Sequence, residues 1–141
     1  MNPPPLSLQN LTKSYGKLQA VDDLSFSLEE GEIFGLLGPN GAGKTTTLSI
    51  IAGLETPSSG KAEVFGIDIA KDPISVKQKI GVIPQEISSQ GFFTVEEILT
   101  YTSGYFGICD NQSWIQFLLH TLDLFEHKDK IGSHLSGGMK R

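Results

Sequence analysis

The feature that most constrains this chain is a glycine-rich segment at residues 38–45, which reads GPNGAGKT. It satisfies the pattern G-x-x-x-x-G-K-[ST], with Lys44 and Thr45 at its last two fixed positions. The apolar run at 33–37 precedes it without alternation, which predicts a strand buried on both faces of a parallel sheet. A helix is predicted from about Lys44. Strand, glycine loop and helix in this order predict an α/β fold with a phosphate-binding loop.

The predicted chemistry of this loop follows from its residue types. Glycines let the backbone N–H groups wrap an anion, and the helix directs its positive end toward the same place. Lys44 is expected to reach the β- and γ-phosphates, while the Thr45 hydroxyl takes one position on Mg²⁺. We therefore predict a nucleoside triphosphate ligand, ATP with Mg²⁺. The residues predicted to hold it are Gly38, Pro39, Asn40, Gly41, Ala42, Gly43, Lys44, Thr45 and Thr46.

Composition narrows the class of protein further. The 141 residues are 38% hydrophobic, enough for a packed core, and carry a formal charge of −5. The longest cluster of Lys or Arg is Lys140-Arg141, which argues against a nucleic-acid partner, because backbone phosphates require concentrated positive charge. Cys109 is the single cysteine, so an internal disulfide is excluded and a reducing compartment is favoured. No apolar run approaches the roughly 20 residues that span a bilayer.

The first 90 residues predict strands followed by helices. Partial alternation at 6–11 and 18–28, with a polar turn at 14–17, indicates two antiparallel strands. The helix from Lys44 is expected to place Leu48, Ile51 and Ala52 on one face and to end at Gly53. A strand is expected at 61–65, followed by a helix that is capped by Asp72 and ends near Ile80. A further strand is expected at Val82-Ile83.

The later residues predict a helical unit. Thr94 to Glu97 form a capping box, and an apolar pattern continues from Ile98 to Phe125 with Trp114 expected in the helix core. The predicted organisation is a disordered tail at 1–5, an ATP-binding core with an antiparallel β subdomain at 6–90, and a helical subdomain at 91–141.

A second anion-binding pattern lies near the C-terminus, where residues 135–139 read LSGGM. Ser136 is a candidate N-cap, followed by two glycines and the start of a helix. Taken alone, this sequence is typical of a flexible turn. If both patterns contact one nucleotide, two chains facing head to tail would each contribute one of them.

With these motifs in this order, the sequence resembles the ATP-binding subunits of ABC transporters across essentially all of its length. Tyr15 matches the aromatic residue of that family that stacks on adenine. Gln85 matches the glutamine that contacts Mg²⁺, orients the attacking water and couples to the membrane subunit. The residues that match the family signature, which contacts the partner's ATP in trans, are Leu135, Ser136, Gly137, Gly138 and Met139.

The resemblance implies partners and a location. It implies a second ATP-binding subunit, as a homo- or heterodimer, and a separate transmembrane permease. The protein would then be cytoplasmic, peripheral on the inner face of the membrane, and most similar to exporter-type subunits. Two alternatives stay open at this point: a soluble ABC-type ATPase acting on ribosomes or DNA, and a phosphotransferase of the P-loop class.

The resemblance also implies that some motifs lie beyond Arg141. These are an Asp for Mg²⁺ after an apolar strand, a catalytic Glu and a later His. We therefore expect an N-terminal part of such a protein, with an incomplete parallel sheet and exposed edges at 33–37. No catalytic residue is predicted within it except for a water-positioning role of Gln85. The complete protein would be an ATPase, and the 141-residue chain alone is expected to be inactive.

Overall fold

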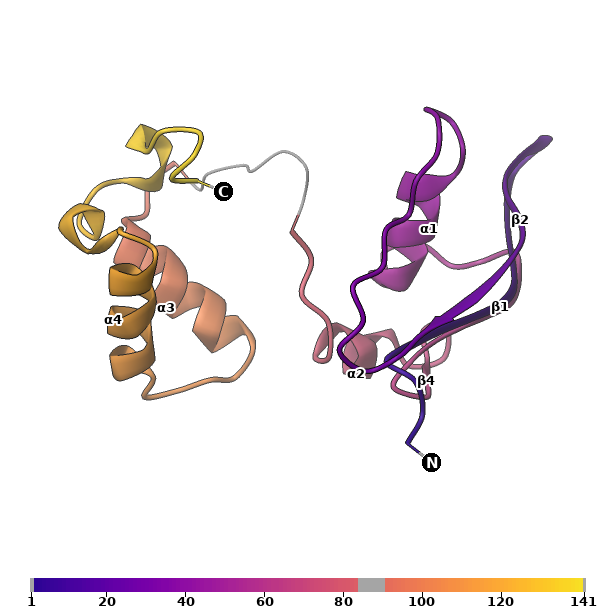
Figure 1. Cartoon of the computed structure of the whole chain (residues 1–141), viewed down its shortest axis with the longest axis horizontal. Coiled ribbons are helices and arrows are strands. Elements are labelled where there is room, and N and C mark those ends of the chain that lie inside the picture. Colours follow the sequence, from indigo (N-terminus) through magenta and orange to yellow (C-terminus); the bar gives the residue numbers. More distant parts are fainter. Residues whose placement is uncertain (1, 84–90, 141) are drawn as a thin grey trace. The chain divides into compact units, whose positions relative to one another are not determined.

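The computed structural model describes residues 2–83 and 91–140. Its contacts divide the chain into two compact units, Met1–Val82 and Ile83–Arg141. Figure 1 shows a sheet with helices in the first unit and helices alone in the second. The division expected from the sequence, between residues 90 and 91, borders segment 84–90, which lies outside the described residues.

The first unit is built on an antiparallel hairpin. Strand β1 (Leu6–Tyr15) pairs with β2 (Leu18–Leu28) in a register that places Leu8 opposite Phe26. The turn uses Gly16 at φ +60°, a conformation that glycine adopts without strain. Strands β3 (Ser59–Val64) and β4 (Ile67–Asp68) extend the sheet in the order β2-β1-β3-β4, with every pair antiparallel. The predicted antiparallel strands are confirmed.

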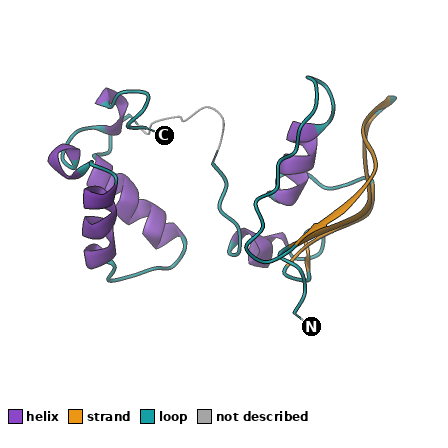
Figure 2. Ribbon diagram, in the orientation of Figure 1, coloured by secondary structure: helices purple, strands orange, loops and turns teal. Residues whose placement is uncertain are grey.

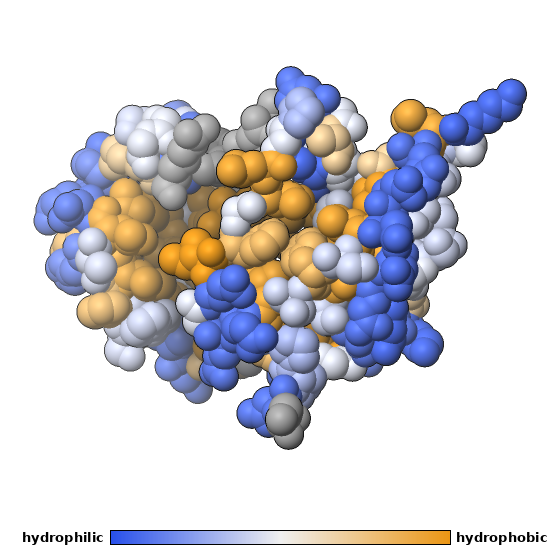
Figure 3. Space-filling model, turned by 45° about the vertical axis from the view of Figure 1, so that its right-hand side comes forward, coloured by the Kyte–Doolittle hydropathy of each residue, from blue (hydrophilic) through white to orange (hydrophobic). Residues whose placement is uncertain are grey.

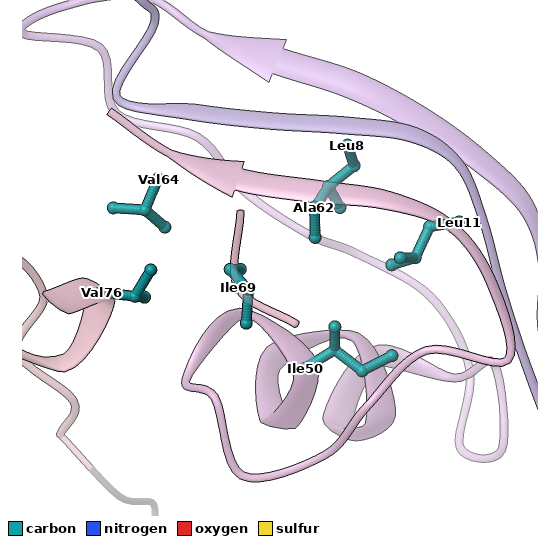
Figure 4. Packing of buried hydrophobic residues seen from close by; sticks show 7 residues of the cluster. All are labelled: Leu8, Leu11, Ile50, Ala62, Val64, Ile69 and Val76. Carbon is teal, nitrogen blue, oxygen red and sulfur yellow. The ribbon is translucent and has the colours of Figure 1, made fainter. Parts of the chain in front are cut away.

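Two helices cover one face of this sheet. Helix α1 (Lys44–Ile51) contributes Ile50 and helix α2 (Pro73–Lys77) contributes Val76, and both side chains are fully buried. Figure 4 shows them pointing at side chains of the strands. The buried cluster consists of Leu8, Leu11, Ile50, Ala62, Val64, Ile69 and Val76. Burying these side chains ties the helix that follows the glycine loop to the sheet.

The ends of α1 and α2 follow the predicted signals. Gly53 ends α1 at φ +65°, where its amide donates to the carbonyl of Ile50 and the next amide donates to Ser49, a Schellman motif. Asp72 caps α2 by accepting a hydrogen bond of 3.1 Å from the Ser75 amide. Hydrogen bonding by the Ser75 side chain, and then by its amide, lowers the pKa of the Asp72 carboxyl. Helix α2 nevertheless ends at Lys77, earlier than predicted.

The predicted face of α1 was partly wrong. Leu48 is 56% exposed, whereas Thr47 and Ile50 are buried. The Thr47 hydroxyl donates to the Gly43 carbonyl at 3.0 Å, which satisfies this polar group without water. The spacing of apolar residues along a helix does not by itself reveal that a threonine can take a core position in this way.

Two predicted strands are absent from the described residues. Residues 33–37 form no ladder, and Ile33 and Leu37 are 99% and 93% exposed. Val82 and Ile83 are likewise exposed and unpaired in the described part of the chain. A strand requires neighbours that accept its backbone hydrogen bonds, and the described residues offer these runs none. Apolar side chains therefore reach the surface, as the orange areas of Figure 3 illustrate.

The second unit is helical, as predicted (Figure 2). It contains α3 (Val95–Tyr105), α4 (Gln112–Thr121), and the short 3₁₀ turns η1 (Phe125–His127) and η2 (Gly132–His134). The capping box is present: Thr94 Oγ1 accepts from the Glu97 amide at 3.3 Å, and Glu97 Oε2 accepts from the Thr94 amide at 2.8 Å. No helix of the described chain is long and apolar enough to cross a membrane.

The core of this unit differs from the prediction at Trp114. Val95, Ile115 and Leu119 form the buried cluster, with Leu135 packed against it. Trp114 is 57% exposed and stacks on the Phe117 ring, with the ring centroids 5.0 Å apart. The register of α4 turns the smaller Ile115 into the core, because the next residue along a helix lies about 100° away.

Candidate functional site

The glycine loop is held in place by its contact with the hairpin. Gly43 is the N-cap of α1 and has φ +80°, a conformation that favours glycine. A Cβ atom built there would overlap the backbone carbonyl of Ala20 in β2. The loop can lie this close to the strand only because residue 43 has no side chain. The second fixed glycine of the motif therefore sets the position at which α1 begins.

The first turn of α1 leaves its amides available. In the described part of the chain, no acceptor takes the amides of Lys44, Thr45 or Thr46, and the N-cap provides no side-chain hydrogen bond. The first amides of a helix attract an anion when no cap satisfies them. At the start of α3, by contrast, the amides of Val95 and Glu96 donate to the carbonyls of Lys130 and Lys128. The amides at the start of α1 are thus available to an anion, whereas those of Val95 and Glu96 at the start of α3 are already bonded.

The side chain of Lys44 folds back over its own loop. Its Nζ donates to the carbonyl oxygens of Gly38 and Pro39, both at 2.6 Å. These neutral carbonyls hold a full positive charge beside the amides of the first helical turn. A phosphate group entering the loop would meet this ammonium and the helix amides together. The donor set fits an anion with several oxygen atoms.

The loop also offers an oxygen ligand for magnesium, provided that a triphosphate is bound with the ion. Mg²⁺ usually keeps several waters and binds through one or two protein oxygens together with substrate phosphates. The exposed Thr45 can offer its hydroxyl from the first turn of α1. Gln85, the other predicted ligand, lies outside the described residues. Within residues 2–83 and 91–140, no group of three or more His, Cys, Asp or Glu side chains could hold a metal ion by itself.

Tyr15 lies at the end of β1, beside the turn of the hairpin that supports the glycine loop. The residue is 43% exposed, and the Lys13 ammonium lies 5.0 Å from the ring centroid. Lys13 also pairs with Glu55 Oε2 at 2.9 Å and donates to the Thr56 carbonyl at 2.7 Å. Hydrogen bonding by Lys13, and then by Tyr15, lowers the pKa of Glu55 below its ordinary value. An aromatic ring with this exposure can stack on a planar base.

The LSGGM segment belongs to the helical unit. Leu135 packs against the core, whereas Ser136, Gly137 and Gly138 are exposed. The Ser136 hydroxyl accepts a hydrogen bond of 3.3 Å from the Met139 amide, which is the side-chain contact of an N-cap. The helix expected to follow is not formed within the described residues, where 137–140 make a turn. Lys140 Nζ donates to the Ser133 carbonyl at 2.8 Å and braces the same turn. The exposed serine and glycines are therefore presented on a turn that the core supports.

Sequence reasoning missed three residues that shape this site. Ala20 receives the glycine loop, and Lys13 and Glu55 surround Tyr15. Lys13 could have been noticed, because residues two apart on a strand share a face. Glu55 carried no such signal, since only the fold brings it to a strand 42 positions earlier in the sequence, 55 against 13.

Comparison with known proteins gives consistent matches. The family model described as ABC transporter matches residues 21–141. The linearmycin resistance ATP-binding protein LnrL of Bacillus subtilis is 45% identical over 139 residues, which are 96% of this chain and 44% of the relative. The Nod factor export ATP-binding protein I of Burkholderia orbicola is 40% identical over 143 residues, covering 100% of this chain and 47% of the relative.

A solved structure described as the ATP binding subunit of an ABC transporter matches with a TM-score of 0.86 and 28% identity, over 96% of this chain and 57% of that chain. The chain thus spans about half the length of the curated relatives that it matches.

Proposed function

Because the chain belongs to the ABC transporter family, we propose that it provides a nucleotide-binding surface in which residues 38–46 hold the triphosphate of ATP and Tyr15 stacks on the adenine. The observation that carries this proposal is the start of α1. There, a glycine N-cap, amides without an acceptor among the described residues and the Lys44 ammonium converge on one loop. This combination suits an anion with several oxygen atoms, such as a polyphosphate.

Each residue of the loop has a separate role in this proposal. Lys44 would exchange its hydrogen bonds to two carbonyls for stronger bonds to phosphate oxygens, since both partners are then charged. Gly43 keeps the helix start against β2 so that the amides stay in place. Thr45, together with Gln85, would bind the magnesium that accompanies the nucleotide. Magnesium, when bound, neutralises charge on the phosphate oxygens.

We further propose that residues 135–139 contact the ATP held by a second ATP-binding subunit. The exposed Ser136 and its two glycines have the geometry to meet an anion from outside the chain. Two such subunits would face head to tail, each offering its glycine loop to the other's signature segment. A separate membrane permease, a position on the cytoplasmic face and an export function complete the proposal. The names of relatives, which refer to resistance and export, support the last point.

The central test replaces Lys44 by alanine and titrates the 141-residue chain with Mg-ATP, following backbone amide signals by NMR. In the unaltered chain the amide signals of Gly38 and of residues 40–46 should shift and saturate, Pro39 having no N–H. Lys44→Ala should weaken binding at least about tenfold, because a charged hydrogen bond contributes roughly 1.5–3 kcal/mol. Lys71→Ala is the matched control, since it removes the same charge from an exposed side chain that pairs with Asp68 at 3.4 Å. Equal affinities of all three proteins would contradict the proposal.

The role of residues 135–139 has its own test. Ser136→Arg should leave the binding of ATP by a monomer unchanged, because the segment serves the partner's nucleotide. The same change should abolish nucleotide-driven dimers, as measured by sedimentation velocity with and without ATP. A loss of ATP binding by the isolated monomer would argue against a role in trans.

A further inference from the structure

The surroundings of Tyr15 form a side-chain cluster that the proposed function does not use. Lys13 and Tyr15 are two positions apart on β1 and therefore share a face of the strand. The Lys13 ammonium lies 5.0 Å from the ring centroid of Tyr15, close enough for a cation–π interaction. One face of the ring is thus covered by a cation from the same strand, while Tyr15 as a whole stays 43% exposed.

The ammonium of Lys13 is held by two acceptors from a distant segment. Glu55 Oε2 lies at 2.9 Å and the Thr56 carbonyl oxygen at 2.7 Å. The Lys13 side chain is only 15% exposed and that of Glu55 34%, so both are less accessible than an ordinary surface pair. Hydrogen bonding by Lys13, and then by Tyr15, lowers the pKa of Glu55 below its ordinary value. The ring is therefore restrained at one face, by an ammonium that two acceptors hold in place.

The segment that carries Glu55 is fixed to the end of α1. The amides of Leu54 and Glu55 both donate to the carbonyl of Ser49, at 2.9 and 3.2 Å. The other end of the same helix is Lys44, at the glycine loop. A single helix of eight residues thus connects the loop with the support of the Tyr15 ring. At a rise of 1.5 Å per residue, eight helical residues span roughly 12 Å.

We propose that Lys13 and Glu55 are positioning residues for the nucleotide base, which hold the Tyr15 ring in a fixed orientation relative to the glycine loop. This inference rests on the proposed function, because it needs a base to stack on Tyr15. The pair touches neither the base nor the phosphates. Because the pair restrains the Tyr15 ring before the ligand arrives, less conformational entropy is lost when a base stacks on the ring. The pair therefore favours a ligand with a planar base over a ligand without one.

The prediction is a selective loss of affinity. Lys13→Met removes the charge but keeps the length of the side chain, and it should weaken the binding of Mg-ATP about two- to fivefold, the range of one exposed cation–π contact. Glu55→Ala should have a similar effect. The affinity for tripolyphosphate, which lacks a base, should stay the same for both variants. Lys13→Arg keeps the charge and should restore the binding of Mg-ATP.

The matched control is Lys61→Met, which breaks the pair of Lys61 with Glu63 at 2.8 Å on neighbouring strand β3. It should change the affinity for neither ligand. Tyr15 ring signals in ¹³C-labelled protein provide a readout without nucleotide. They should shift and broaden in Lys13→Met, while those of Tyr101 and Tyr105 stay in place.

Several results would overturn the inference. Unchanged ATP affinity in Lys13→Met, an equal loss for ATP and tripolyphosphate, or an unchanged Tyr15 signal would each refute the positioning role. Different results would refute the proposed function itself: Lys44→Ala would bind Mg-ATP as tightly as the unaltered chain, or the unaltered chain would not bind Mg-ATP. If Tyr15→Ala binds ATP as the unaltered chain does, stacking is wrong while the glycine loop keeps its role.

Discussion

Gly43→Ala should destabilise the first unit more than any other single-methyl change in the glycine loop. Residue 43 has φ +80°, where an L-residue costs roughly 1–2 kcal/mol. The added Cβ would also overlap the Ala20 carbonyl, which belongs to a strand and cannot rotate away. Forcing one carbon into such a contact costs roughly 1–3 kcal/mol. The sum is a loss of roughly 2–5 kcal/mol in the free energy of unfolding.

Gly41→Ala separates the backbone cost of a positive φ from the cost of the contact with Ala20. Gly41 has φ +85°, and a Cβ built there meets no atom within 4 Å. The expected loss is therefore the backbone term alone, roughly 1–2 kcal/mol. The two variants differ by the contact with Ala20, so the difference between them should be roughly 1–3 kcal/mol.

Native-state hydrogen exchange is the suitable assay, because it reports on each unit separately. The Thr47 amide, which donates to the Gly43 carbonyl at 2.8 Å, reports on the altered junction. The Ile115 amide in α4, bonded to Asn111 at 3.0 Å, should keep its protection in both variants. Equal loss of Thr47 protection in Gly43→Ala and Gly41→Ala would refute the argument that close packing on β2 requires glycine at position 43.

Two further predictions concern the helical core and the pair at Tyr15. Leu119→Ala should lower the free energy of unfolding by roughly 2–5 kcal/mol, because Leu119 is fully buried. Trp114→Ala should lower it by roughly 1 kcal/mol or less, because Trp114 is more than half exposed. Urea denaturation measures both losses, and a larger loss for Trp114→Ala than for Leu119→Ala would contradict the assigned core. Hydrogen bonding by Lys13, and then by Tyr15, lowers the folded-state pKa of Glu55 below its ordinary value, so its stabilising contribution is present above the unfolded pKa and is lost as pH falls through the folded pKa. An NMR titration in which the pKa of the Glu55 carboxyl is no lower in the folded chain than in the unfolded chain would be incompatible with that contact.

Local signals were reliable where the interaction they depend on is itself local. The capping box at Thr94, the cap at Asp72 and the glycine stop at Gly53 all formed as predicted, because each needs only partners within a few residues. The hairpin of β1 and β2 was predicted for the same reason. The helix after the glycine loop also begins at the expected residue, Lys44.

Predictions that depend on distant partners succeeded less often. The apolar run at 33–37 has the composition of a buried strand, yet it is exposed and unpaired within the described residues. Composition can show that a segment favours a sheet, but neighbouring strands decide whether the sheet exists. The prediction that Trp114 lies in the helix core was wrong for a related reason, because the face of α4 that is buried depends on where α3 packs.

The sequence by itself determined the glycine loop, the helix that follows it and the order of the motifs, since spacing and residue type carry that information directly. Only the tertiary structure decided how the loop is supported. Ala20 receives Gly43, and Glu55 reaches Lys13 from a segment 42 positions later in the sequence, 55 against 13. Such contacts depend on the packing of α1 against the sheet, which no local pattern encodes.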